Sequence, residues 1–218
     1  MIATHLPSLR GLLQGLSSAA HTIFSSLSTS LSIPAGQRFE DFQRLSRPSP
    51  DILRLLKYHA DADKSCLPQT PHTDLGSLTF VFASMPGLQV LPVGMGQNPA
   101  SYDESDWRYV VPRPGHAVVN IGDCVSIMTN GLLKSALHRV GPVVGCAMPE
   151  RYSMAYLMRP ENQTVLRILD SPLVPQSVSN GEDLTSGEWI RRKFKALRGQ
   201  KDAGNFDQIL TGGRGILV

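Results

Sequence analysis

The chain has no Cys-x-x-Cys pair, no apolar run of membrane-spanning length, and no Asp or Glu before Glu40. Its three cysteines, Cys66, Cys124 and Cys146, are odd in number and irregularly spaced. This spacing argues against a disulfide framework and a zinc-finger site, and it favours a reducing compartment. Because no apolar run is long enough to span a bilayer, we expect a cytoplasmic protein with no membrane partner.

An excess of either charge is also absent, since the net charge is only +3 over 218 residues. So small a charge, evenly spread, argues against a nucleic-acid partner. Only residues 191–198 are locally basic, and they predict a solvated helix face. With 41% hydrophobic and 18% charged residues, the composition is typical of an ordinary globular protein with one core.

The acid-free, serine-rich N-terminal segment has two interpretations. Its composition resembles that of an organelle transit peptide. However, apolar residues from Leu6 to Leu31 recur in steps of three and four, which predicts one long amphipathic helix that stops before Pro34. Only Arg10 is basic before Arg38, so the structural helix is favoured. Residues 1–50 are then expected to pack, as a helix and a linker, on the rest of the chain.

Short strand-like runs, separated by Gly and Pro turns, fill the middle of the chain. The clearest are Ile52 to Tyr58 and Leu78 to Ala83; the others are residues 88–92, 107–111, 117–123, 125–128, 132–140 and 151–157. Such a series predicts a mainly β fold with flanking helices, in which residues 51–170 form an antiparallel jelly roll. Residues 171–218 are expected to add a helix, from about Gly187 to Arg198, and a tail.

A candidate metal site begins with His72 and Asp74, which precede the strand that starts at Leu78. Residues i and i+2 of a strand point to the same face, so an imidazole and a carboxylate could share one ion. His138, on another predicted strand, supplies a third ligand. Two histidines and one carboxylate suit iron(II) with three open positions. On these three residues alone, a metal site and a fortuitous pattern both remain open.

A second pair of residues points to a co-substrate. Arg151 and Ser153 share a strand face, so a guanidinium group and a hydroxyl group could together hold a carboxylate. A dicarboxylic co-substrate could then reach from this pair to the metal.

The order and spacing of these motifs resemble the iron(II)/2-oxoglutarate-dependent dioxygenases of the isopenicillin N synthase-like family. The motifs are His72-Thr73-Asp74, residues 119–123, residues 129–131, residues 134–140 and Arg151-Tyr152-Ser153. The resemblance is close from Leu53 to Pro160. It implies a double-stranded β-helix, an iron triad of His72, Asp74 and His138, and a 2-oxoglutarate site formed by Arg151 and Ser153.

Tyr58 falls where many family members place a tyrosine that hydrogen-bonds 2-oxoglutarate. The family commonly shows Asn-Tyr-Tyr-Pro-Pro there, whereas this chain has Leu56-Lys57-Tyr58-His59-Ala60. Only the last tyrosine of that motif is kept.

The resemblance implies an oxidoreductase that uses Fe(II), 2-oxoglutarate and O2. Such an enzyme hydroxylates, desaturates or cyclises a small organic molecule, here expected in secondary metabolism, and releases succinate and CO2. Two alternatives stay open: an iron oxidase that uses the same triad without 2-oxoglutarate, and a truncated, catalytically silent interaction protein.

The silent alternative rests on the N-terminal side of the chain. Family members carry a further segment ahead of the long helix, which completes the main sheet. We therefore expect a jelly roll that is incomplete at its N-terminal side, with a dimer mate or another partner covering the exposed sheet.

Several other polar and aromatic residues are assigned structural roles. Asn120 and Asp123 are expected to order a turn through backbone hydrogen bonds. Trp107 and Trp189 are expected to be core anchors, and His116 to have a packing or turn role.

Overall fold

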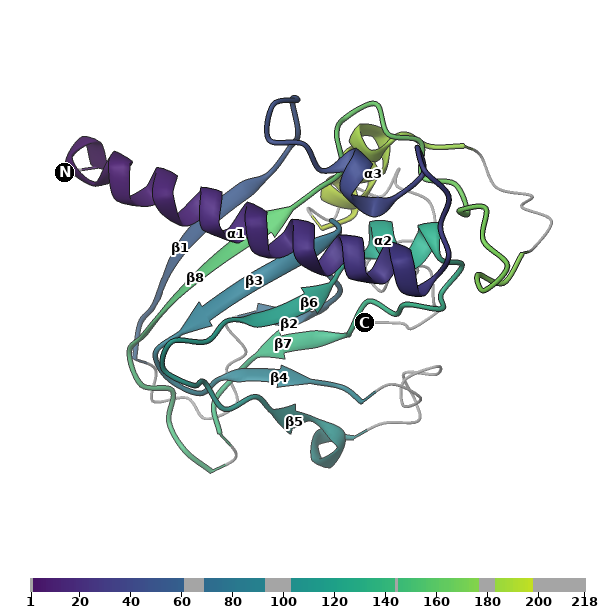
Figure 1. Ribbon diagram of the computed structural model, residues 1–218. Coiled ribbons are helices and arrows are strands. Elements are labelled where there is room, and N and C mark those ends of the chain that lie inside the picture. The colour runs from purple at the N-terminus through teal and green to yellow at the C-terminus, as the bar shows by residue number, and fades with distance from the viewer. Residues whose placement is uncertain (1, 61–68, 93–102, 144, 177–182, 198–218) are drawn as a thin grey trace.

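Two antiparallel sheets and a long helix make up the fold (Figure 1). The computed structural model describes residues 2–60, 69–92, 103–143, 145–176 and 183–197. The main sheet has the strand order β1-β8-β3-β6 and the smaller sheet the order β2-β7-β4-β5. This arrangement confirms the predicted jelly roll of mainly β structure with flanking helices.

The strands are β1 (Ile52–Tyr58), β2 (Gln69–His72), β3 (Leu78–Ala83), β4 (Leu88–Val90), β5 (Arg108–Tyr109), β6 (Val118–Ile121), β7 (His138–Val140) and β8 (Arg151–Met158). The α-helices are α1 (Ile2–Ser30), α2 (Asp123–Met128) and α3 (Ser186–Leu197), with short 3-10 helices at Phe39–Phe42 and Glu104–Asp106. The long N-terminal helix and the C-terminal helix are thus present as predicted. The predicted tail lies outside the described residues.

Three elements differ from the prediction. Of residues 132–140, expected as one strand-like run, only His138–Val140 form a strand. Residues 125–128, expected as a strand, belong to α2, because the backbone N–H groups of Asp123 and Cys124 donate to the carbonyls of Asp74 and Gly76 and start a helix there. A short apolar run does not distinguish a strand from a buried helix by periodicity alone. Strand β2 was not predicted, and it ends at His72, so Asp74 lies beyond the strand.

The hydrophobic core lies on the outward face of the main sheet, under α1. Leu78 and Phe80 of β3 and Tyr156 of β8 pack there with Phe24 of α1. Because alternate residues of a strand face opposite sides, Thr79 and its inward-facing neighbours point into the space between the two sheets. That space therefore lies apart from the core, and both polar and apolar side chains line it.

Part of this outward face is exposed. Leu55, Val119 and Tyr152 are 69%, 41% and 52% exposed, on strands β1, β6 and β8 of the main sheet. None of the described helices is long and apolar enough to cross a membrane.

The cysteines and tryptophans behave as expected where they are described. Cys124 is buried and Cys146 is exposed, and neither forms a disulfide; Cys66 lies outside the described residues. Trp107 is buried. The guanidinium carbon of Arg139 lies over its indole ring, 4.2 Å from the ring centroid. Trp189 packs against the main core.

Candidate metal centre

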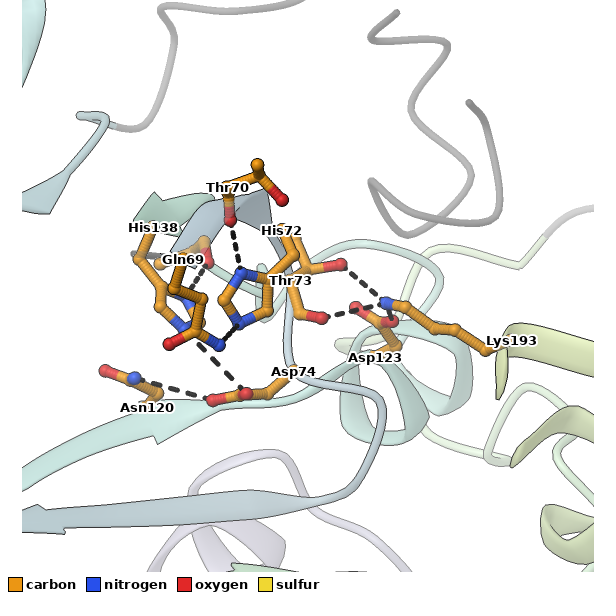
Figure 2. Close-up of polar contacts among 10 residues, drawn as sticks. Gln69, Thr70, His72, Thr73, Asp74, Asn120, Asp123, His138 and Lys193 are labelled. Atoms are coloured by element: carbon orange, nitrogen blue, oxygen red, sulfur yellow. Dashed lines mark hydrogen bonds and ion pairs between the residues drawn. The ribbon is translucent and has the colours of Figure 1, made fainter. Parts of the chain in front are cut away.

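The smaller sheet brings the two candidate histidine ligands together. His72 at the end of β2 is paired with His138 at the start of β7, and their ring centroids are 4.3 Å apart. Asp74 follows β2, and its Oδ1 lies 3.8 Å from Nε2 of His138. One ligand atom from each residue lies within 4.8 Å of the other two, and Figure 2 shows the three side chains pointing toward one another. One ion between them could contact all three.

Backbone carbonyls orient both imidazoles. Nδ1 of His72 is 2.8 Å from the carbonyl oxygen of Thr70, and Nδ1 of His138 is 3.0 Å from that of Ala136. Because a carbonyl only accepts, the proton lies on Nδ1 in each ring and Nε2 carries the lone pair that a metal would bind. In His72 this lone pair accepts from Nε2 of Gln69, 2.9 Å away. Burial, with the nearby charge of His138, lowers the pKa of His72 to about 4. Its imidazole is therefore neutral at neutral pH, as a ligand requires.

The carboxylate of Asp74 is buried but ionised. Burial acts to raise its pKa, but His138, His72 and hydrogen bonds from Thr79 and Asn120 outweigh burial and hold the pKa below its usual value. Nδ2 of Asn120 lies 3.5 Å from Oδ2 of Asp74. Asn120, expected only to order a turn, therefore also faces the candidate ligand.

A buried lysine holds the peptide between the two ligands of the His-x-Asp motif. Nζ of Lys193 donates to the carbonyl oxygen of Thr73 at 2.9 Å and to its Oγ1 at 2.8 Å. It also forms an ion pair with Asp123 (Figure 2). Lys193 and Asp123 are 0% and 1% exposed, so α3 fixes the loop between His72 and Asp74.

One prediction was therefore wrong in part, and another was incomplete. Residues 191, 192 and 195 of the basic run are exposed as expected, but Lys193 is not, because one face of α3 packs onto the His-x-Asp loop. Asp123 does more than order a turn, since its carboxylate is the buried partner of that lysine. Charge runs in a sequence do not reveal which member meets a partner from elsewhere in the chain.

A cavity of about 190 Å³ between the sheets contains this centre. All six residues that the sequence singled out line it, namely Tyr58, His72, Asp74, His138, Arg151 and Ser153. The structure thus brings together side chains from β1, β2, β7, β8 and the segment after β2.

Arg151 is the buried cation at one end of this cavity. It is 2% exposed, and its guanidinium lies 4.9 Å from the ring centroid of Tyr58. Its Nη2 is 3.5 Å from the carbonyl oxygen of Met85, while Nε and Nη1 are buried without a partner among the described residues. A buried, underbonded guanidinium is costly unless an anion satisfies it. This arrangement fits the carboxylate of a dicarboxylic co-substrate, with Ser153 on the same strand face.

A jelly roll that encloses a His-Asp-His cluster and a buried, underbonded arginine suits an iron-dependent oxygenase that uses a 2-oxo acid. The family model described as the 2OG-Fe(II) oxygenase superfamily matches residues 49–160, and the chain belongs to this superfamily. The predicted family, the double-stranded β-helix, and the Fe(II) and 2-oxoglutarate cofactors are thereby confirmed. Placement in its isopenicillin N synthase-like branch stays a prediction.

Particular relatives support the same family. The 2-oxoglutarate-dependent dioxygenase iboH of Amanita muscaria is 35% identical over 193 residues, which are 88% of this chain and 85% of that protein. The structure of a full-length Neurospora crassa protein in complex with alpha-KG and 5-formyluracil has a TM-score of 0.69 and 25% identity, over 87% of this chain and 60% of that one. The chain spans a smaller share of other curated relatives, such as 54% of frbH from a Dothideomycetidae species.

The sequence missed several residues that line the cavity or contact the centre. Nε2 of Gln69 is 2.9 Å from Nε2 of His72, and Arg54, Arg159 and Phe194 line the cavity. None of these residues carries a local motif. Only Arg54 could have been found from the sequence. Alternate residues of a strand face the same side, so Arg54 lies on the same face of β1 as Tyr58.

Proposed function

We propose that this chain is an Fe(II)- and 2-oxoglutarate-dependent oxygenase that oxidises a small organic molecule in secondary metabolism. In this proposal His72, Asp74 and His138 hold the iron, Arg151 and Ser153 bind the distal carboxylate of 2-oxoglutarate, and Tyr58 supports it. The single observation that carries the proposal is that a three-ligand cluster and an underbonded buried arginine line one cavity.

The chemistry that iron supplies when bound is the activation of O2, coupled to decarboxylation of 2-oxoglutarate to succinate and CO2. The residues of the chain prepare the site for it. The carbonyls of Thr70 and Ala136 hold the imidazoles in the tautomer that offers Nε2. Asp74 supplies a negative charge that its neighbours keep ionised. Arg151 orients a dicarboxylate by its far end, which leaves the other end directed along the cavity.

Anaerobic reconstitution tests this assignment. Protein loaded with Fe(II) and 2-oxoglutarate should show a weak visible charge-transfer band, which His72→Ala and Asp74→Ala should abolish. His116→Ala, a change at an exposed histidine outside the cluster, should leave the band intact. Absence of the band in the unmodified protein, together with tight retention of zinc, would overturn the proposal.

Arg151→Ala separates co-substrate binding from metal binding. Loss of a charge-assisted pair to a carboxylate costs about 1.5–3 kcal/mol, so the concentration of 2-oxoglutarate needed for half-maximal turnover should rise roughly 10-fold to 100-fold. Fe(II) affinity, measured without 2-oxoglutarate, should stay within about twofold. An equal loss of both would show that Arg151 acts only as part of the fold.

The alternatives give different products. An oxidase on the same triad would consume O2 without forming succinate, and a silent interaction protein would do neither. The unpartnered nitrogens of Arg151 favour the 2-oxoglutarate enzyme, because the other two functions give a buried guanidinium no anion to bind. Measurement of succinate against O2 consumed distinguishes all three.

The same proposal includes three further points. A dimer mate or another partner covers the main sheet, and the protein is cytoplasmic. The chain is divided into residues 1–50, 51–170 and 171–218. Exposed Leu55, Val119 and Tyr152 support the covered sheet. Sedimentation at micromolar concentration measures whether two chains of 23.8 kDa associate.

A further inference from the structure

The cavity has a second cationic region, away from Arg151. Arg54 lies on β1 and Arg159 directly follows β8, and both line the cavity. Tyr58 is paired with Arg151 across the two strands, whereas Arg54 is paired with Ala155. Four residues along a strand span roughly 13 Å. An anion held at Arg54 is therefore a different group from the carboxylate held at Arg151.

Arg159 is buried and only partly satisfied. It is 2% exposed, its Nη1 donates to the carbonyl oxygen of Pro50 at 2.6 Å, and its guanidinium lies 5.2 Å from the ring centroid of Phe194. Its Nε is buried and has no partner in the described part of the chain. One donor of this fixed guanidinium thus remains to be satisfied.

Arg54 reinforces the positive charge. Burial lowers the pKa of Arg159, and the nearby positive charge of Arg54 lowers it further, while Asp51 and Asp74 act in the opposite direction. Arg54 itself is exposed. Asp74 is the one acidic side chain among the described residues that line the cavity, and it belongs to the metal centre. Two guanidinium groups that repel each other beside a cavity are stabilised by an anion that contacts both.

The wall near this region is apolar. Ala155 and Leu157 of β8 and Leu75 line the cavity, together with the ring of Phe194. A small ligand held here by an anionic end would place an apolar body against these side chains, close to Asp74 of the candidate metal centre.

We propose that Arg54 and Arg159 bind a carboxylate of the substrate, which is therefore a small carboxylic acid with an apolar body. This inference rests on the proposed function, because it takes the metal centre as the place of reaction. Arg159 is the fixed half of the carboxylate subsite and Arg54 the accessible half.

Equilibrium binding to the full chain tests the subsite. The protein is loaded with Mn(II), as a redox-inert substitute for Fe(II), and with saturating 2-oxoglutarate, which occupies Arg151. The probes are phenylacetate and hexanoate, each beside its neutral amide, phenylacetamide and hexanamide. At least one carboxylate should bind about tenfold or more tightly than its amide, as expected for hydrogen bonds to a charged group.

Arg54→Gln should reduce that carboxylate-to-amide ratio by about threefold or more, because Arg159 alone then holds the carboxylate. Lys57→Gln, on the same strand but outside the cavity lining, should leave the ratio unchanged. Equal affinity for the acid and amide of each pair, or a ratio that Arg54→Gln leaves unchanged, would overturn the subsite. The affinities for Mn(II) and for 2-oxoglutarate, measured in the same samples, distinguish a failure of the oxygenase proposal from a failure of the carboxylate subsite. Failure of these two to bind contradicts the oxygenase, whereas their binding without a carboxylate preference contradicts only the subsite.

Discussion

A single lysine side chain connects the C-terminal helix to the candidate metal ligands. Nζ of Lys193 contacts the carbonyl oxygen and Oγ1 of Thr73, the residue between His72 and Asp74, and is paired with Asp123. The pKa of Asp123 is raised by burial, against the opposing effect of Lys193. Because both charged groups are buried, loss of either leaves an uncompensated charge inside the protein.

Lys193→Met should therefore be strongly destabilising. Removing one partner of a buried pair costs about 3–5 kcal/mol of unfolding free energy, measured by urea denaturation. Lys195→Met, at an exposed position of the same helix, should stay within about 0.5 kcal/mol.

The double variant Lys193→Met with Asp123→Leu separates stability from positioning. It removes both buried charges and should recover much of the lost stability. It should not recover Fe(II) affinity, because the contacts to Thr73 are still missing. Recovery of both properties would show that Lys193 has no part in positioning the ligands.

At the residue scale, the sequence revealed those side chains whose type and spacing match a chemical task. His72, Asp74, His138, Arg151 and Ser153 were found in this way, and all line one cavity. Lys193 and Arg159 were not found, because a lysine in a basic run or an arginine before a proline looks like an ordinary solvated residue. Only the packing of α3 and the end of β8 shows that both are buried.

At the element scale, two glycines allow the His-x-Asp loop to lie against β8 and α2. A Cβ on Gly76 would collide with the carbonyl oxygen of Met158, and one on Gly122 with the carbonyl oxygen of Gly76. Hydrogen bonds to the carbonyls of Asp74 and Gly76 from the start of α2 depend on this close approach. These contacts are between backbone atoms, which cannot move aside as a flexible side chain would.

Gly122→Ala should therefore lower the unfolding free energy by about 1–3 kcal/mol or more, as overpacking does. Gly11→Ala, in α1 with open space around it, should raise it by about 0.5–1 kcal/mol, because alanine is the better helix former. Thermal or urea denaturation of both variants measures the difference. A neutral Gly122→Ala would mean that the loop and α2 separate without cost.

The elements predicted best are continuous, mostly apolar runs of strand length. The bounds of β1 and β3 agree with the prediction. Residues 125–128 were assigned wrongly because Val125 and Ile127 look like strand residues, whereas the helix starts from hydrogen bonds that Asp123 and Cys124 donate to the carbonyls of Asp74 and Gly76. Strand β2 is short, and the sequence around it is polar. Its pairing with β7 is a tertiary contact without a local pattern.

At the scale of the whole molecule, the hydrophobic core and the candidate site occupy opposite faces of the main sheet. Phe24, Phe80 and Tyr156 pack on the outward face, whereas the ligands lie inside. The fold therefore does not need the metal for its core. Ligands that bind only the native state should nevertheless stabilise it by mass action.

Fe(II) and 2-oxoglutarate, each at about 100 times its Kd, should add about 2.7 kcal/mol apiece under anaerobic conditions. For a chain of this size, each kcal/mol raises the Tm by roughly 2–4 °C, so the two together should raise it by roughly 10–20 °C. A chelator should reverse the metal contribution. His138→Ala should show no shift with Fe(II), and an equal shift in that variant would place the metal elsewhere.

The position of Lys193 near the C-terminal end of the described chain affects the order in which the protein is completed during synthesis. His72, Asp74 and His138 leave the ribosome well before α3 does. Until α3 docks, the carboxylate of Asp123 lacks its cationic partner and the ligand loop lacks its support. The candidate metal centre is therefore completed only after α3 has been made, so a nascent chain that stops before Ser186 carries the ligands without the lysine that holds their loop in place.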